Sequence, residues 1–290
     1  AGESETARKL IEMRSANEGL KIFAADVLDY HSITDALKGC CGLFYAFDQS
    51  QNAAGYNCVL NRCLLGLKGA FDNMQERMVE IEARGAHNVL EACAQTETIK
   101  KVVFTSSVCA AIWSEYPSAT DDLDERYWSD VSYCRKLKLW YALAKTLAEK
   151  TAWALAMDRG LKMVTVNAAL VVGPEFSQHN SESTLAYLKG AAQMYEDGVL
   201  ASVDVRYLAD AQICVFEDSS SYGRYICFNQ IVNCAQHAVD LAKSLKPLVT
   251  LPDRWEDPRV YSQRLSNVKL SKLMVGNECK TMQMVGSQFF

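Results

Sequence analysis

The chain has 290 residues, of which 49% are hydrophobic and 22% charged, which suits one large α/β domain or two interlocked ones. Its formal net charge is −5 and it contains no basic run, which argues against nucleic acid or an anionic membrane as a partner. The longest apolar stretches fall well short of a bilayer span, and the start of the sequence lacks the pattern of an export signal. We therefore expect a cytoplasmic protein with no membrane partner.

The cysteines and histidines are distributed in a way that argues against disulfides and metal binding. Eleven cysteines are scattered through the chain without a CxxC pair, and the four histidines lie far apart. In a long chain without an export signal, such cysteines indicate free thiols in a reducing compartment. We expect no structural zinc site and no other metal.

The first part of the chain predicts helices and strands in alternation. Apolar runs bounded by turn residues predict strands, and the segments between them have the composition of short helices, one of which Ser32 can cap. We expect a helix over residues 3–15, a strand over 22–25, a helix over 32–37 and a strand over 43–47. This order of elements is typical of a parallel α/β sheet.

The rest of the chain continues this alternation after an irregular stretch. Residues 48–75 show no clean period, whereas Leu137–Asp158 is the clearest helix, with Gly160 placed to cap its end. We expect further helices over 74–94, 185–195 and 235–245, and strands over 101–107, 163–172 and 225–228. We recognise no repeat and no linker between independent domains.

A tyrosine, a lysine and a serine form the candidate catalytic set. Tyr141 and Lys145 lie four residues apart in the clearest helix, so their side chains share one face. A nearby ammonium stabilises a phenolate and lowers the pKa of the phenol, which helps it donate a proton to a carbonyl oxygen. Ser107 ends a predicted strand, at the edge where open α/β sheets bind ligands, and its hydroxyl can hydrogen-bond the same oxygen. The alternative is that the first two are solvated helix residues and the third is a strand cap.

Five segments resemble the cinnamoyl-CoA reductase and dihydroflavonol reductase group of the extended short-chain dehydrogenase/reductase superfamily. They are ADVLDYHSITDALKGCCGLFY (25–45), NVLEACAQTETIKKVVFTSSV (88–108), LWYALAKTLAEKTAWALA (139–156), NAALVVGP (167–174) and YGRYICFN (222–229). The resemblance implies a doubly wound, Rossmann-like parallel sheet whose N-terminal strands are missing, and a smaller C-terminal substrate lobe. It places a partial dinucleotide-binding domain over residues 1–173 and the substrate lobe over 174–290, interleaved with the sheet around 222–229.

By this resemblance the chain is an NADP-dependent oxidoreductase, with NAD not excluded, that reduces a carbonyl on an aromatic or phenylpropanoid-like small molecule. Ser107 then orients the carbonyl, Tyr141 donates the proton, and Lys145 tunes Tyr141 and hydrogen-bonds the nicotinamide ribose. The residues that match the family's cofactor contacts are Asp26, Val27, Ala46, Phe47, Asp48, Ala168, Ala169, Leu170 and Val171.

The sequence departs from the family at the phosphate-binding turn. None of its 15 glycines forms the GxxGxxG or GxGxxG turn whose backbone N–H groups hold a pyrophosphate. The GxxG at Gly39 leads into a strand, and the one at Gly66 has Asp72 in the third place, where a carboxylate repels phosphate. By resemblance the chain begins just before the third strand of the sheet. We therefore expect a fragment or incomplete gene product that by itself binds dinucleotide poorly.

Two further segments differ from the family. Relatives have a shorter connection at residues 57–76, which a retained intron or a genuine insertion would explain. Residues 139–145 read LWYALAK where true cinnamoyl-CoA reductases carry NWYCYGK, and Phe47 replaces a small residue beside the cofactor. We therefore doubt a hydroxycinnamoyl thioester as the substrate.

Two other functions remain as alternatives. A non-catalytic pseudoenzyme or binding protein of the same fold would explain the missing phosphate-binding turn. An extended short-chain dehydrogenase acting on a steroid or a sugar nucleotide would share the catalytic set, but the KTLAEKTAW block (145–153) favours the reductase group. The sequence does not indicate an oligomeric state.

Overall fold

A computed structural model describes residues 21–47, 68–116, 122–173, 181–245 and 257–276. Its centre is a four-stranded parallel sheet in the order β1-β2-β3-β6. These strands are β1 (Gly42–Tyr45), β2 (Lys101–Ser107), β3 (Met163–Ala168) and β6 (Gly223–Cys227). The register places Ser107 opposite Ala168, so the carboxyl ends of β2 and β3 meet at one edge. The expected α/β class and the predicted strand 101–107 are confirmed.

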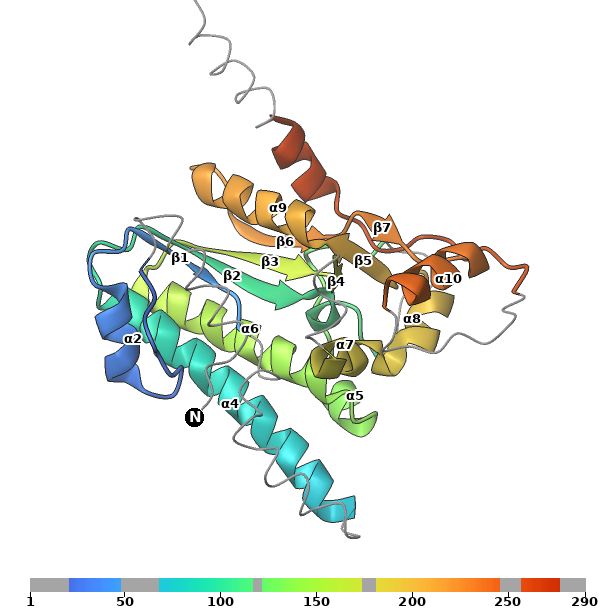
Figure 1. The fold of residues 1–290 in the computed structure, drawn as a ribbon, viewed down its shortest axis with the longest axis horizontal. Helices are drawn as coiled ribbons and strands as arrows, with labels where there is room; N and C mark the ends of the chain where they lie inside the picture. Colours follow the sequence, from blue (N-terminus) through green and yellow to red (C-terminus); the bar gives the residue numbers. More distant parts are fainter. Residues whose placement is uncertain (1–20, 48–67, 117–121, 174–180, 246–256, 277–290) are drawn as a thin grey trace, which may run out of the picture.

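Helices cover both faces of this sheet, as a doubly wound fold requires (Figure 1). On one face lie α2 (Tyr30–Leu37), α4 (Lys68–Ala94) and α6 (Trp140–Arg159), and on the other lies α9 (Val205–Glu217). Strand side chains alternate between the two layers. Val102 and Phe104 are buried in the same cluster as residues of the first three helices, whereas Val103 belongs to the cluster that includes α9.

The end of α6 follows from its sequence, but its start does not. Gly160 adopts a left-handed conformation with φ 67° and closes the helix, as predicted. The predicted start at Leu137 is wrong, because a separate short helix, α5 (Val131–Lys136), comes first and the chain turns through Lys138 at φ 55°. The Asp130 side chain accepts a hydrogen bond from the Tyr133 N–H and caps α5.

A second, smaller sheet and several short helices form the remainder of the described chain. This sheet has the order β4-β5-β7, with β4 (Leu170–Val172), β5 (Ala201–Asp204) and β7 (Gln230–Ile231). The helical segments here are α7 (Ser181–Tyr187), η4 (Leu188–Gly190), α8 (Ala191–Glu196) and α10 (Ala235–Ser244), while η2 (Val108–Ala110) follows β2. The division at residues 173 and 174 stays a prediction, although β6 does complete the main sheet from the later part of the chain.

Two predicted single elements are interrupted in the structure. The strand expected over 163–172 is two strands. Ala169 still donates its N–H to the Cys227 carbonyl of the main sheet, and from Leu170 the chain pairs with β5 in the second sheet. The helix expected over 185–195 is broken into α7, η4 and α8. Apolar periodicity does not reveal such breaks, since buried residues continue on both sides of them.

The first described residues correct two further predictions. Residues 22–25 are not a strand, because no described strand pairs with them; Ile22 and Phe23 are exposed. The cap of α2 is Asp29, whose side chain accepts from the His31 N–H, whereas the Ser32 hydroxyl donates to the Asp29 carbonyl. The N-terminal cap of α2 that we assigned to Ser32 is thus made by Asp29, three residues earlier.

The helix α4 begins at Lys68, six residues before its expected start at Met74, so the last part of the stretch that we read as irregular is helical. The expected helix over 3–15, the residues 57–67 of the unusual connection and the predicted cofactor contact Asp48 lie outside the described residues. Across the described helices, none is both long enough and apolar enough to cross a membrane.

Candidate active site

A cavity of about 280 Å³ opens at the carboxyl ends of the main-sheet strands. This is the edge at which open α/β sheets bind their ligands. The strand ends, α6 and the C-terminal helices all contribute to it. Its lining residues include Ala46, Phe47, Thr105, Ser106, Tyr141, Lys145, Ala168, Ala169, Leu170, Val171, Thr184, Tyr187, Leu208 and Gln212. Six of the nine predicted cofactor contacts therefore lie in one cavity with two members of the catalytic set.

Tyr141 and Lys145 occupy the first turns of α6 and face this cavity together. The Lys145 Nζ lies 5.6 Å from the centroid of the Tyr141 ring. Burial raises the pKa of Tyr141 above its usual value; the Lys145 ammonium and a hydrogen bond with the Ser107 side chain act in the opposite direction. The structure thus brings together the phenol, ammonium and hydroxyl that the sequence analysis proposed.

Ser107 lies deeper than the other two residues of the set. It is the last residue of β2, its exposed fraction is 2%, and it does not line the cavity. Its Oγ accepts a hydrogen bond from the Cys109 N–H at 3.2 Å and so caps η2. A strand cap and a contact to Tyr141 are therefore combined in one hydroxyl, where the sequence analysis treated them as alternatives.

Lys145 makes a close contact that the sequence analysis missed. Its Nζ lies 2.6 Å from Oε1 of Glu82 in α4 and donates to the Phe47 carbonyl oxygen at 3.0 Å. The Glu82 and Lys145 residues are 6% and 9% exposed. A signal was present in the sequence, because Glu82 lies three positions after Val79 and four before Ala86, on the same helix face as these two apolar residues.

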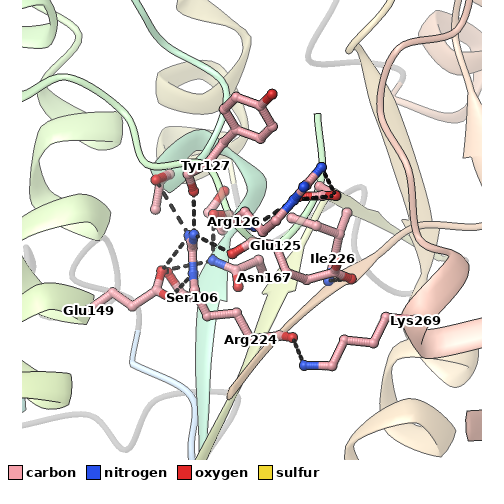
Figure 2. Close-up of polar contacts among 12 residues, drawn as sticks. Ser106, Glu125, Arg126, Tyr127, Glu149, Asn167, Arg224, Ile226 and Lys269 are labelled. Carbon is pink, nitrogen blue, oxygen red and sulfur yellow. Dashed lines mark hydrogen bonds and ion pairs between the residues drawn. The ribbon is translucent and has the colours of Figure 1, made fainter. Parts of the chain in front are cut away.

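A buried polar network holds the end of β2 in place (Figure 2). Glu149, one turn beyond Lys145 on α6, accepts hydrogen bonds at its Oε2 from the Ser106 hydroxyl and from Asn167 Nδ2, both at 2.7 Å. The same Asn167 nitrogen lies 3.2 Å from the Ser107 carbonyl oxygen. The Ser106 side chain is therefore bonded to α6, and the Ser107 backbone to β3.

Arg224 of β6 completes this network. Its Nε lies 2.6 Å from Glu149 Oε1, and its guanidinium stacks over the Trp128 ring at 3.8 Å. The guanidinium also donates to the carbonyl oxygens of Glu125 and Tyr127 (Figure 2). The network was not predicted. Glu149 and Arg224 both lie in segments that carry the family resemblance, but their partners come from distant parts of the sequence, and local spacing does not reveal such contacts.

Two further predicted cofactor contacts, Asp26 and Val27, lie outside the cavity. Asp26 is exposed and accepts from the Leu28 N–H, while the Val27 carbonyl oxygen accepts from Asn88 Nδ2 at 3.0 Å. Neither residue lines the cavity. Among the described residues, no glycine-rich turn follows a strand and no cluster of three metal-binding side chains occurs.

Comparison with known proteins shows the family. The model of the NAD dependent epimerase/dehydratase family matches residues 48–212, so the chain belongs to that family, and it is an oxidoreductase of the extended short-chain dehydrogenase class. Cinnamoyl-CoA reductase 1 of Petunia hybrida is 32% identical over 270 residues, which cover 91% of this chain and 74% of that protein. Cinnamoyl-CoA reductase 2 of Medicago truncatula is 33% identical with the same coverage.

Other relatives and solved structures agree with this assignment. Tetraketide alpha-pyrone reductase 1 of Arabidopsis thaliana is 26% identical and matches 99% of this chain and 80% of its own. Vestitone reductase from alfalfa superposes with a TM-score of 0.65 at 24% identity, covering 94% of this chain and 82% of that chain. Yeast methylglyoxal/isovaleraldehyde reductase Gre2, complexed with NADPH, has a TM-score of 0.65 at 18% identity and covers 95% and 84%. These two likenesses show the fold.

Proposed function

We propose that this protein reduces a carbonyl group on a small aromatic or phenylpropanoid-like molecule with NADPH as the reductant. The observation that carries the proposal is the arrangement of Tyr141, Lys145 and Ser107 at the carboxyl edge of the sheet, beside a cavity. The similarity to plant cinnamoyl-CoA and tetraketide alpha-pyrone reductases supports the reaction class.

The residues of the cavity fit the nicotinamide end of such a cofactor. Ala46, Ala168 and Ala169 have small side chains and leave room at the strand ends. A bound reduced nicotinamide would supply a hydride to the substrate. The described residues do not form a phosphate-binding turn, so we propose that this chain retains the dinucleotide weakly and prefers NADPH, the form bound in the yeast neighbour.

The catalytic set would handle the oxygen of the substrate. The Tyr141 hydroxyl would donate its proton to the carbonyl oxygen as the carbonyl carbon is reduced, and Lys145 would stabilise the phenolate that remains. The Ser107 Oγ accepts from the Cys109 N–H, which orients the hydroxyl and fixes its position beside Tyr141. The network of Glu149 and Arg224 would hold this strand end still during the reaction.

The cavity walls support an aromatic substrate. Phe47, Leu170, Tyr187 and Leu208 are apolar or aromatic, and Thr184 and Gln212 add a few polar groups, a composition typical of small-molecule sites. Phe47 also lines the cavity and is bulkier than the small residue that the family resemblance implies at this position. For this reason we propose a compact aldehyde or ketone, and not a hydroxycinnamoyl thioester, as the substrate.

Turnover of a panel of aromatic aldehydes and ketones tests the proposal, with NADPH raised until the rate saturates. Tyr141→Phe removes the proton donor, and we expect kcat to fall by about 100-fold or more. The matched control is Tyr187→Phe, which removes a hydroxyl from the same cavity and should change kcat by a few fold at most. Equal rates for wild type and Tyr141→Phe would contradict the proposal.

A non-catalytic protein of the same fold is the second candidate. Two observations favour it: Glu82 neutralises the charge of Lys145, and Phe47 narrows the cavity. Under this alternative, an aromatic carbonyl compound would bind and raise the melting temperature, but no member of the panel would be reduced by wild type. Turnover that depends on Tyr141 would exclude it.

A further inference from the structure

Glu82 is a buried carboxylate in direct contact with the ammonium of the catalytic set. It lies in the middle of α4, a long helix that packs against α6 over much of its length (Figure 1). Its Oε1 is 2.6 Å from Lys145 Nζ, and both residues are more than nine-tenths buried. Ion pairs in such a setting are poorly screened by water and salt, so each partner strongly affects its neighbours.

In the part of the chain that the structure describes, the groups that face Tyr141 come from five elements. Lys145 lies on α6, Glu82 on α4, Ser107 at the end of β2, Cys109 on η2 and Tyr187 on α7. Of these, Lys145 carries a positive charge and Glu82 a negative one, while the other three are uncharged in the neutral range. Tyr45, a buried tyrosine of β1, is also close enough to interact electrostatically with both Glu82 and Lys145.

Among the described residues, the formal charges beside Tyr141 therefore cancel. A lone ammonium at this distance favours the phenolate, but a carboxylate 2.6 Å from that ammonium offsets much of its field. The pKa of Tyr141 agrees with this geometry: burial raises it most, Lys145 lowers it, and Glu82 raises it. Because Glu82 compensates Lys145, the ion pair favours the phenolate less than Lys145 alone would. Burial then keeps the phenol protonated.

We propose that Glu82 is a positioning residue that compensates the charge of Lys145 and thereby sets how alkaline the solution can become before Tyr141 loses its proton. In the reduction, which rests on the proposed function, the Tyr141 O–H bond breaks as the O–H bond of the product alcohol forms. The carbonyl carbon gains the hydride of the reduced nicotinamide, which is oxidised. The reaction needs Tyr141 protonated at its start, so Glu82 extends the working range toward high pH.

Direct titration of Tyr141 tests the inference without cofactor or substrate. The ultraviolet difference absorbance of phenolate is followed against pH, and the signal of Tyr141 is isolated by subtracting the same curve for each variant combined with Tyr141→Phe. In Glu82→Gln, which keeps the shape of the side chain, we expect the ionisation of Tyr141 to move to lower pH by about one unit or more. Glu82→Asp, which keeps the charge, should remain near wild type. The matched control is Glu80→Gln, an exposed acid of the same helix, which should titrate as wild type does.

A second comparison keeps the test decisive if Glu82→Gln does not fold. In Lys145→Met the carboxylate stands alone beside Tyr141, and ionisation should need higher pH than in wild type. Adding Glu82→Gln to Lys145→Met removes both charges and should return the ionisation toward the wild-type pH, because the net charge is again close to zero. The same ionisation pH in these two variants would overturn the proposal, as would an unchanged Tyr141 titration in folded Glu82→Gln.

Activity gives an independent readout. If the enzyme reduces an aromatic carbonyl, the alkaline fall of kcat/KM should move to lower pH in Glu82→Gln and stay in place in Glu80→Gln. A purely structural role of Glu82 would change the melting temperature but not the pH of this fall. Absence of turnover in every variant would refute the proposed function, whereas the titration of Tyr141 would still decide the role of Glu82.

Discussion

Glu149 and Arg224 form an ion pair next to the end of β2, the strand that carries Ser107. The Arg224 Nε and the Glu149 Oε1 are 2.6 Å apart. Glu149 is fully buried and Arg224 is 6% exposed. The carboxylate is also hydrogen-bonded by the Ser106 hydroxyl and by Asn167, so the pair joins α6, β2, β3 and β6 (Figure 2). Charges that are buried and partnered in this way cost much when one partner is removed.

We expect Arg224→Met to lower the free energy of unfolding by about 3–5 kcal/mol, because Glu149 is left as a buried carboxylate without its cation. Chemical denaturation measures this change. The control is Arg159→Met, whose ion pair with Glu91 lies near the surface and should contribute about 1 kcal/mol or less. A loss of less than 1 kcal/mol for Arg224→Met would contradict the role that we give to the pair.

We expect the replacement of Lys101 to have a second large effect on stability. Its Nζ donates to the carbonyl oxygens of Val215 and Asp218 at 2.5 and 2.7 Å and contacts the Ser221 hydroxyl at 2.6 Å, so it holds the end of α9. We expect Lys101→Met to lower the free energy of unfolding by about 1.5–3 kcal/mol. Lys100→Met, at the exposed neighbouring position, is the control and should be close to neutral. Thermal or denaturant unfolding of both variants checks this; equal stability of the two would rule the contact out as a stabilising one.

Phe47 should limit the size of the substrate. Phe47 lines the cavity, and its contact with Lys145 uses the backbone carbonyl oxygen, so Phe47→Ala removes the bulky ring and preserves that hydrogen bond. We expect KM for bulky aromatic carbonyl compounds to fall several-fold, with a smaller effect on compact ones. Phe44→Ala, in β1 three residues before Phe47 and outside the cavity, is the control. If both variants change KM alike, Phe47 does not determine substrate size.

The reduction should tolerate alkaline solution. Burial and Glu82 raise the pKa of Tyr141 above its usual value, although Lys145 and Ser107 act against them. The acid form is the active one, so raising this pKa moves the alkaline loss of kcat/KM to higher pH. We expect this loss to lie above about pH 10, the ordinary value for tyrosine. A pH profile measured within the range where circular dichroism shows a folded chain checks this. A Tyr141-dependent fall near neutral pH would contradict it.

The sequence by itself determined the parts of this protein that rest on local spacing. A four-residue interval on a helix places Tyr141 and Lys145 on one face, Gly160 ends that helix, and the apolar run before Ser107 is a strand. The helix face and the helix end depend on contacts within a few residues, and the strand was recognisable from its continuous apolar run, although its hydrogen bonds are made to distant strands.

Tertiary structure alone decided what surrounds the catalytic set of Tyr141, Lys145 and Ser107. The contacts of Lys145 with Glu82 and of Glu149 with Arg224 join helices and strands that are far apart in the chain. Whether residues 22–25 form a strand likewise depends on a neighbouring strand and not on their own composition. Burial and charge pairing are properties of the packed chain, because a carboxylate strongly affects a phenol only after folding removes the water between them.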